Sequence, residues 1–195
     1  DWTQKENIVL LYDESFVDFA DEENQTLIES EYLNAYQNLI VVKSISKSYG
    51  VPGLRLGVLA SGNRELIAWL KKDVAIWNIN SLAEYYMQIE EKYKKDYIAG
   101  LKRFREERKD FLNKLGKIDG IRIMPTQANY VMVELESGIK AGTVTRKLLM
   151  KEQILVKDLS QKAGQNGRQY LRIAIRNHEE NERLLTALEQ CIREE

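Results

Sequence analysis

A lysine set among serines and glycines is the feature of this sequence most suited to chemistry. Residues 44–57 read SISKSYGVPGLRLG, so Lys47 lies between two serines and Arg55 follows it between two nearby glycines. A lysine amine attacks a carbonyl only when it is neutral, and partial burial favours that form. Hydroxyl groups and an arginine fork bind a phosphate dianion, and glycines allow close backbone approach. The string therefore suits a phosphorylated aldehyde cofactor.

Taken alone, a lysine beside glycines is more typical of a strand–turn–strand with a surface lysine. The whole string is more specific, because it resembles the Schiff-base lysine signature of fold-type I pyridoxal 5'-phosphate (PLP) enzymes of the class I/II aminotransferase family. That signature reads roughly S-x-S-K, a short turn and G-x-R-x-G. The resemblance implies that Lys47 forms the Schiff base with PLP and that Ser44 and Arg55 bind the cofactor phosphate.

An acidic residue upstream extends the resemblance. Asp13 begins the string DESF, which is similar to the D-E-A-Y or D-E-A-F element of the histidinol-phosphate aminotransferase branch. The resemblance implies that Asp13 pairs with the pyridine nitrogen of PLP, which keeps the ring cationic and able to accept electrons. In isolation, an acid at a strand end is more typical of a cap on the next segment.

Phe16 departs from the common pattern. Many aminotransferases carry at this position a tyrosine that donates to the ring oxygen of the cofactor, and phenylalanine has no donor. The run from Phe16 to Phe19, FVDF, resembles the version found in threonine-phosphate decarboxylase, a relative in the same branch. We therefore place Phe16 in the cofactor site and keep decarboxylation open beside transamination.

Candidate substrate-binding residues lie in the second half of the chain. The string PTQANY, which contains Asn129, resembles the P-S-x-A-N-[FY] element of the branch, and residues 170–181 resemble R-[IV]-x-[IV]-G-x-x-x-E-N. The first arginine of that element binds the substrate α-carboxylate, which implies this role for Arg172. Arg176 stands where many aminotransferases have glycine and relatives with decarboxylase activity often have arginine. It is a candidate for a substrate phosphate or is exposed to solvent.

The pattern of apolar residues predicts an α/β chain. Strand-like and helical segments alternate first, and a long helical pattern interrupted near Gly100 then leads to a smaller α+β unit. Expected strands are residues 7–16 (buried and parallel), 38–45, 54–60, 121–124, 130–135, 154–157 and 169–175, and expected helices are residues 29–37, 63–74, 81–115, 143–151 and 178–193.

Three strands before the long helix are too few for a full doubly wound sheet. We therefore expect residues 1–90 to be the C-terminal part of a PLP-binding large domain and residues 91–195 to be a small α+β domain, with an N-terminal half preceding them. The family resemblance implies a homodimer.

Composition excludes several classes of protein. Of 195 residues, 44% are apolar and 30% charged, and the net charge of −1 gives no electrostatic case for nucleic acid or a membrane surface. No apolar run approaches the roughly 20 residues of a membrane span, so we expect a cytoplasmic protein. A single cysteine, Cys191, and a single histidine, His178, offer no zinc-type cluster, and we expect no metal site.

We therefore expect a PLP-dependent aminotransferase acting on an amino acid or amino-phosphate. The alternative is a PLP-dependent decarboxylase of a phosphorylated amino acid. A second alternative is a catalytically silent fragment that serves in oligomerisation.

Overall fold

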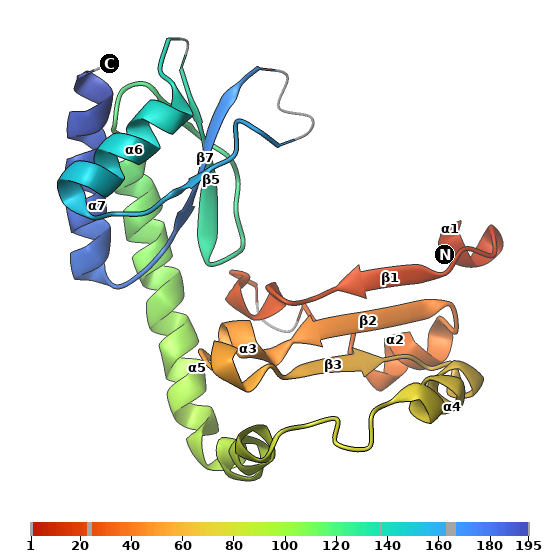
Figure 1. The fold of residues 1–195 in the computed structure, drawn as a ribbon. Helices are drawn as coiled ribbons and strands as arrows, with labels where there is room; N and C mark the ends of the chain where they lie inside the picture. Colours follow the sequence, from red (N-terminus) through yellow and green to blue (C-terminus); the bar gives the residue numbers. More distant parts are fainter. Residues whose placement is uncertain (1, 23–24, 137, 163–166, 195) are drawn as a thin grey trace. The chain divides into compact units, whose positions relative to one another are not determined.

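The computed structural model describes residues 2–22, 25–136, 138–162 and 167–194. The chain divides into two compact units, unit 1 (Asp1–Lys102) and unit 2 (Arg103–Glu195), and each contains one sheet (Figure 1). The division falls inside the long helix. The assignment of residues 1–90 and 91–195 to a large and a small domain stays a prediction.

Unit 1 contains a three-stranded sheet in the order β1-β2-β3. β1 pairs in parallel with β2, and the register sets Asp13 opposite Val42. β2 pairs antiparallel with β3, and Ser44 lies opposite Gly57. The carboxyl ends of β1 and β2 therefore meet at one edge, beside the start of β3. The strands are β1 (Leu10–Asp13), β2 (Leu39–Ser44) and β3 (Gly57–Ala60).

β1 is shorter and more exposed than the sequence predicts. The buried strand expected over residues 7–16 is a strand of only four residues. Leu11, within it, is 63% exposed, and Val9, directly before it, is 65% exposed. β1 is an edge strand, so a neighbour covers it on one side only, and its side chains alternate between the two faces. The prediction of burial was wrong, whereas the parallel pairing is confirmed.

Short helices follow the strand ends of unit 1. η1 comes after β1, and α3 comes directly after β2, so both lie near the shared edge of the sheet. The helical segments are α1 (Trp2–Lys5), η1 (Val17–Phe19), α2 (Ser30–Ala35), α3 (Ile45–Ser48), η2 (Pro52–Leu54) and α4 (Arg64–Asp73).

α5 (Ser81–Leu115) is one continuous helix with residues in both units. At its amino end the Asn80 side chain accepts the Ala83 N–H at 2.9 Å, as a capping residue does. Because α5 runs through Gly100 without a break, the expected interruption there is wrong. One glycine costs a helix only about 1 kcal/mol, and long runs of good helix formers lie on both sides.

Unit 2 contains an antiparallel sheet in the order β4-β5-β7-β6. The strand expected over residues 154–157 is wrong: Ile154 and Val156 pack against the core, which explains why this run is apolar although it is not a strand. Pairing with β7 begins only at Lys157. The strands are β4 (Ile121–Ile123), β5 (Tyr130–Leu135), β6 (Lys157–Asp158) and β7 (Gln169–Ala174).

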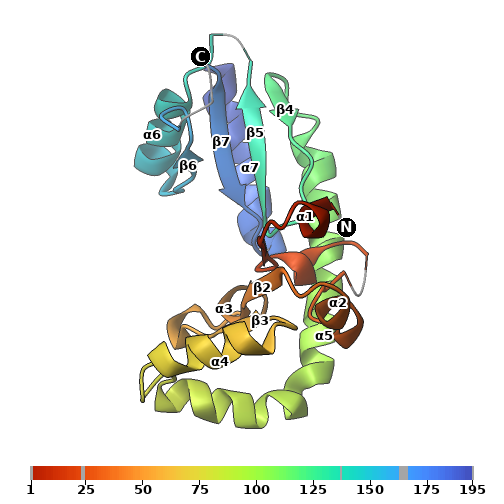
Figure 2. The same cartoon turned by 90° about the vertical axis from the view of Figure 1, so that its right-hand side faces the viewer.

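Helices cover one face of this sheet. The C-terminal part of α5, α6 (Ala141–Glu152) and α7 (His178–Arg193) lie to one side of β5 and β7 (Figures 1 and 2). Alternate residues of β5 are buried beneath them, which confirms the predicted alternation. The core includes Phe111, Val133, Leu148, Ile173 and Leu188. None of the described helices has the length and apolarity needed to cross a membrane.

Candidate functional site

The carboxylate of Asp13 ends β1 and is held by the serine two residues on. The Ser15 N–H donates to Asp13 Oδ1 at 2.8 Å, and the Ser15 side chain also hydrogen-bonds the carboxylate. Both bonds favour the charged form, so they lower the pKa of Asp13 from its ordinary value, and the positive charge of Lys47 lowers it further. An ionised, exposed carboxylate is what pairing with a pyridinium nitrogen requires.

Lys47 lies in α3, directly after β2, and its side chain reaches Phe16, three residues after the end of β1. Its Nζ is 4.9 Å from the centroid of the Phe16 ring, which is within cation–π distance. Lys47 is exposed, so its amine is open to a carbonyl reagent, but it lacks the partial burial expected to favour a neutral amine. Asp13, Phe16 and Lys47 thus come together at one sheet edge.

Side chains of neighbouring segments fasten the amino end of α3. The Ser44 N–H donates to Ser15 Oγ at 3.1 Å. Ser46 is buried, and its hydroxyl accepts the Leu56 N–H at 3.1 Å and donates to the Leu56 carbonyl at 3.3 Å. This bridge ties the lysine helix to the glycine-flanked turn. Ser46 was not predicted as a site residue, although it is the second serine of the S-x-S-K string.

Ser44 and Arg55 line one open hollow of about 450 Å³, together with Ser15 and Gly57. A Cβ on Gly57 would lie 3.3 Å from the Lys43 carbonyl oxygen, so glycine permits β3 to start close to β2. Arg55 is exposed and left-handed, with φ 56° and ψ 40°.

The phosphate-binding candidates and the amine lie in adjoining parts of unit 1. Asp13 and Lys47 are not among the described residues that line the hollow. Ser15 connects the two groups, because it lines the hollow and also bonds the Asp13 carboxylate.

Glu14 is a supporting residue that sequence reasoning missed. It is only 2% exposed, and its carboxylate accepts the Thr26 hydroxyl at 2.7 Å and the Leu27 N–H. Its own N–H donates to the Val42 carbonyl at 2.8 Å. Glu14 therefore holds a distant loop against the end of β1, and the signal for it was the match of Glu14 to the second residue of the D-E-A-F element.

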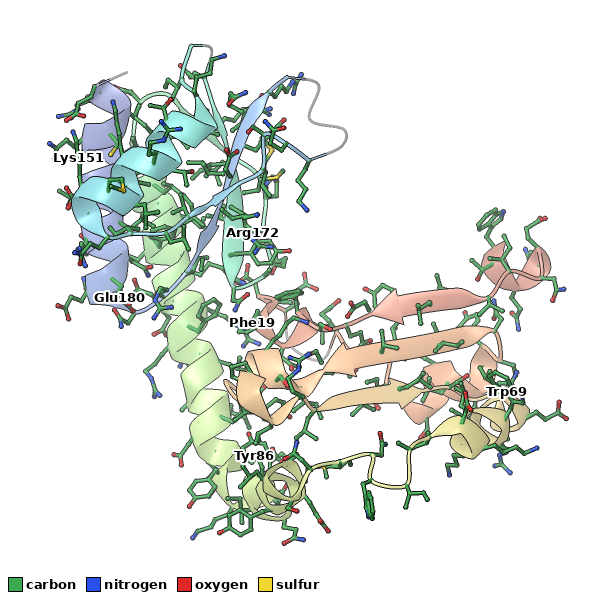
Figure 3. All side chains as sticks on the ribbon, in the orientation of Figure 1. Phe19, Trp69, Tyr86, Lys151, Arg172 and Glu180 are labelled. Atoms are coloured by element: carbon green, nitrogen blue, oxygen red, sulfur yellow. The ribbon has the colours of Figure 1, made fainter. Side chains whose placement is uncertain are left out.

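Arg172 lies on β7 of unit 2, on the face opposite the helices (Figure 3). It is exposed, and its guanidinium carbon is 5.3 Å from the centroid of the Tyr130 ring. An arginine held over an aromatic ring keeps its planar fork available for a carboxylate. The structure does not place this side chain relative to Lys47, since the two belong to different units.

The other two candidates of unit 2 take part in the turn between β7 and α7. The Asn129 carbonyl accepts the Ile175 N–H at 3.0 Å, and Arg176 is paired with Glu180 at 2.9 Å. This bond raises the pKa of Arg176. The buried Asn181 accepts the Arg176 N–H at 2.9 Å and donates to its carbonyl at 3.0 Å, so it fixes the turn.

One trio of ligand-capable side chains meets in unit 2, formed by Glu107, Asp110 and His178. His178 Nδ1 lies 3.3 Å from a Glu107 oxygen, and Asp110 is paired with Lys114 at 2.8 Å. The two carboxylates have partners within the protein, because Asn181 Nδ2 donates to Glu107 Oε1 at 2.8 Å and Lys114 pairs with Asp110.

The residues of unit 1 fit PLP by their chemistry. An accessible primary amine suits an aldehyde, a carboxylate with a lowered pKa suits a pyridinium nitrogen, and an exposed guanidinium beside hydroxyl groups suits a phosphate.

Comparison with known proteins decides the family. The model of the family described as aminotransferase class I and II matches residues 1–188. The chain belongs to this family. Class I and II aminotransferases and their relatives depend on PLP, in agreement with the donor set at the edge of the first sheet.

Relatives of the chain within the aminotransferase family carry out different reactions. The chain is 35% identical to the L-serine phosphate decarboxylase of Sulfurospirillum multivorans, and the match covers 95% of the chain and 48% of the relative. It is 34% identical to the CMP-5'-(3-aminopropyl)phosphonate synthase of Streptomyces rubellomurinus, over 95% of its length and 29% of the relative. The chain thus spans about half, or less, of these curated relatives.

A solved aminotransferase has the same fold. The histidinol-phosphate aminotransferase of Clostridium acetobutylicum superposes with a TM-score of 0.89 and 26% identity, over 100% of the chain and 57% of that structure. The expected fold class, a part of a PLP-dependent transferase that ends in an α+β unit, is therefore confirmed.

Proposed function

We propose that the protein containing this chain is a PLP-dependent decarboxylase of an O-phosphorylated amino acid of the serine or threonine phosphate class. The observation that carries the proposal is the grouping of Asp13, Phe16 and Lys47 at one strand end, with a ring that lacks a hydroxyl beside the amine. The similarity to an L-serine phosphate decarboxylase supports the reaction.

Each candidate residue takes a role in this proposal. Bound PLP supplies an electron sink for the carbanion that remains at Cα when carbon dioxide leaves. Lys47 would hold the cofactor covalently in the resting protein and, once the substrate amine has taken its place, its freed amino group would deliver the proton that replaces the carboxylate at Cα. Asp13 supplies the negative charge beside the ring nitrogen, Phe16 packs beside the amine, and Ser44 and Arg55 bind the cofactor phosphate.

The arginines of unit 2 hold the substrate. Arg172 binds the α-carboxylate, which sets the orientation of the bond to be broken. Arg176 binds the substrate phosphate in exchange for its pairing with Glu180, and Asn129 lines the substrate side. We further propose a cytoplasmic homodimer.

Transamination is the second candidate. The similarity to the histidinol-phosphate aminotransferase of Clostridium acetobutylicum supports it, and the comparisons favour the two reactions about equally. The same residues serve it, with Lys47 moving a proton from Cα. A silent oligomerisation module is the third candidate.

The test uses the full-length protein with PLP and either O-phospho-L-serine or O-phospho-L-threonine. Release of carbon dioxide in a one-to-one ratio with the amine, and no 2-oxo acid, supports decarboxylation. A 2-oxo acid whose formation requires an amino acceptor identifies an aminotransferase instead. Absence of both products, together with unchanged cellular function of a Lys47→Ala variant, identifies a silent module. Unphosphorylated L-serine is the control for recognition of the phosphate.

A further inference from the structure

One carboxylate joins three elements, one of which is the helix that carries Lys47. Asp18 lies in η1, and its Oδ1 accepts a hydrogen bond from Lys43 Nζ at 2.6 Å. Its Oδ2 accepts a hydrogen bond from Ser48 Oγ at 2.6 Å. The Lys43 and Asp18 side chains are only 15% and 17% exposed. Asp18 therefore ties η1 both to β2 and to the carboxyl end of α3.

α3 is too short to hold its own position. It has four residues, and the Tyr49 N–H closes its turn on the Ile45 carbonyl at 3.3 Å. Isolated helices of one turn are unstable in water, because nucleation fixes several residues for one hydrogen bond. Its position must come from neighbouring groups, and Ser48 supplies one such bond at the carboxyl end.

We propose that Asp18 is a positioning residue that sets, through Ser48, where the Lys47 amine stands over the Phe16 ring. Lys47 directly precedes Ser48 in α3, so a shift of the backbone at Ser48 is expected to displace the backbone of Lys47 and, with it, the amine. Lys43 keeps the carboxylate in place, and hydrogen bonds that involve a charged group are roughly twice as strong as neutral ones. The catalytic consequence rests on the proposed function of Lys47.

A second restraint makes the effect of Asp18 separable from unfolding of the helix. The Tyr49 ring stacks on the Tyr97 ring of α5, with centroids 4.1 Å apart and an interplanar angle of 8°. The stack is made by the two rings and not by the Asp18 carboxylate, which lies beside the Tyr97 hydroxyl, and we expect the ring contact to remain when Asp18 is replaced. Loss of the carboxylate is therefore expected to displace α3 and loosen it without removing it.

The test compares Asp18→Ala, Ser48→Ala and the double variant in the full-length protein, with Glu31→Gln, an exposed acid on α2, as control. Hydrogen exchange of residues 44–49 and the pH midpoint of the visible band of the PLP-loaded protein are measured. Asp18→Ala is expected to speed exchange about tenfold, as the loss of a hydrogen bond to a charged group does, and to displace the midpoint. Ser48→Ala is expected to act in the same direction but less strongly. The double variant is expected to match Asp18→Ala, because the two residues share one bond.

Two outcomes would overturn the proposal. One is faster exchange throughout unit 1 with an unchanged midpoint, which would make Asp18 a structural acid only. The other is additive effects in the double variant, which would exclude the route through Ser48. If the wild-type protein shows no visible band with PLP, the proposed role of Lys47 fails, whereas the exchange measurements still test the link between Asp18 and Ser48.

Discussion

The two units are stabilised by different kinds of interaction. In unit 2 a single apolar cluster joins β5 and β7 to α5, α6 and α7. Unit 2 also buries two hydrogen-bonded polar side chains, Arg108 and Asn181, among its described residues. In unit 1 the described buried residues include three polar ones, Glu14, Ser15 and Ser46, each of them hydrogen-bonded. Its buried apolar side chains are fewer among the described residues: Phe19, Leu39, Val41, Leu56 and Ala83.

The difference matches the tasks that we propose for the two units. Apolar packing has no preferred direction, whereas hydrogen bonds fix both distance and angle. The buried polar groups of unit 1 lie next to Asp13 and Lys47 in the chain, where orientation of the reacting groups matters. Unit 2 uses its apolar core to support one arginine on the open face of a sheet.

The largest expected effect is that of Lys47→Ala on the cofactor. Lys47 is the proposed point of covalent attachment, so the variant is expected to lose all PLP that borohydride can trap, while Lys71→Ala, in α4, retains it. Mass spectrometry of the reduced protein measures both. An adduct that persists in Lys47→Ala would refute the assignment of Lys47.

A core substitution in unit 2 is expected to give the largest change in stability. Phe111 is 1% exposed, so Phe111→Ala is expected to lower the free energy of unfolding by about 3–5 kcal/mol, through lost burial and a cavity. Leu11→Ala in β1, at a site 63% exposed, is expected to change it by less than about 1 kcal/mol. Urea unfolding measures both, and equal losses would contradict the expected difference between a buried site of unit 2 and an exposed site of unit 1.

Arg172→Ala is expected to affect substrate and leave the cofactor in place. A hydrogen-bonded pair of charged groups is worth about 1.5–3 kcal/mol, so substrate binding should weaken by roughly tenfold to a hundredfold. Titration with the phosphorylated amino acid gives the affinity, and the visible band gives the PLP content. Arg122→Ala on β4 is the control, and loss of PLP in Arg172→Ala would show that the arginine has another role.

Glu14 tests whether polar contacts stabilise unit 1. Glu14→Ala leaves the Thr26 hydroxyl and the Leu27 N–H without this acceptor, which is expected to cost about 1–3 kcal/mol of unfolding free energy. Glu14→Gln keeps one oxygen acceptor and should cost less. Urea unfolding with a probe in unit 1 measures the difference, and an unchanged midpoint in Glu14→Ala would rule out this role.

The smallest expected effect is a dependence of stability on pH through Asp13. Its pKa is lowered in the folded chain, so its contribution is complete above the ordinary value of 3.8 and is lost as the pH falls through the folded pKa. Because the group is exposed, the contribution should be below about 1 kcal/mol. Asp13→Asn is expected to flatten the acid part of a plot of unfolding free energy against pH, and an identical slope would exclude the effect.

The sequence predicted those elements whose pattern is local. The alternation of apolar residues located Tyr130–Leu135, and the apolar face of His178–Arg193 located the last helix. Asn177 caps that helix by accepting the Glu180 N–H at 2.9 Å. The predictions that were wrong concern features set by segments distant in the sequence. The position of β6 depends on its pairing with β7, and the exposure of β1 depends on its position at the edge of the sheet.

The candidate site divides in the same way. A motif supplied Lys47, Asp13 and Arg55, because these residues stand in short strings. The residues that support them are contacts between segments 10 to 30 residues apart, such as Ser46 with Leu56 and Ser48 with Asp18. No local spacing predicts such pairs. The roles of all these residues stay predictions until variants are measured.

The backbone of Arg55 shows how selection would act on this turn. A left-handed conformation costs a residue with a side chain roughly 1–2 kcal/mol, and glycine avoids that cost. Selection for heat resistance alone would therefore favour glycine at position 55. If Arg55 binds the cofactor phosphate as proposed, selection for activity would favour arginine, and the residue at this position would report which of the two pressures has been stronger.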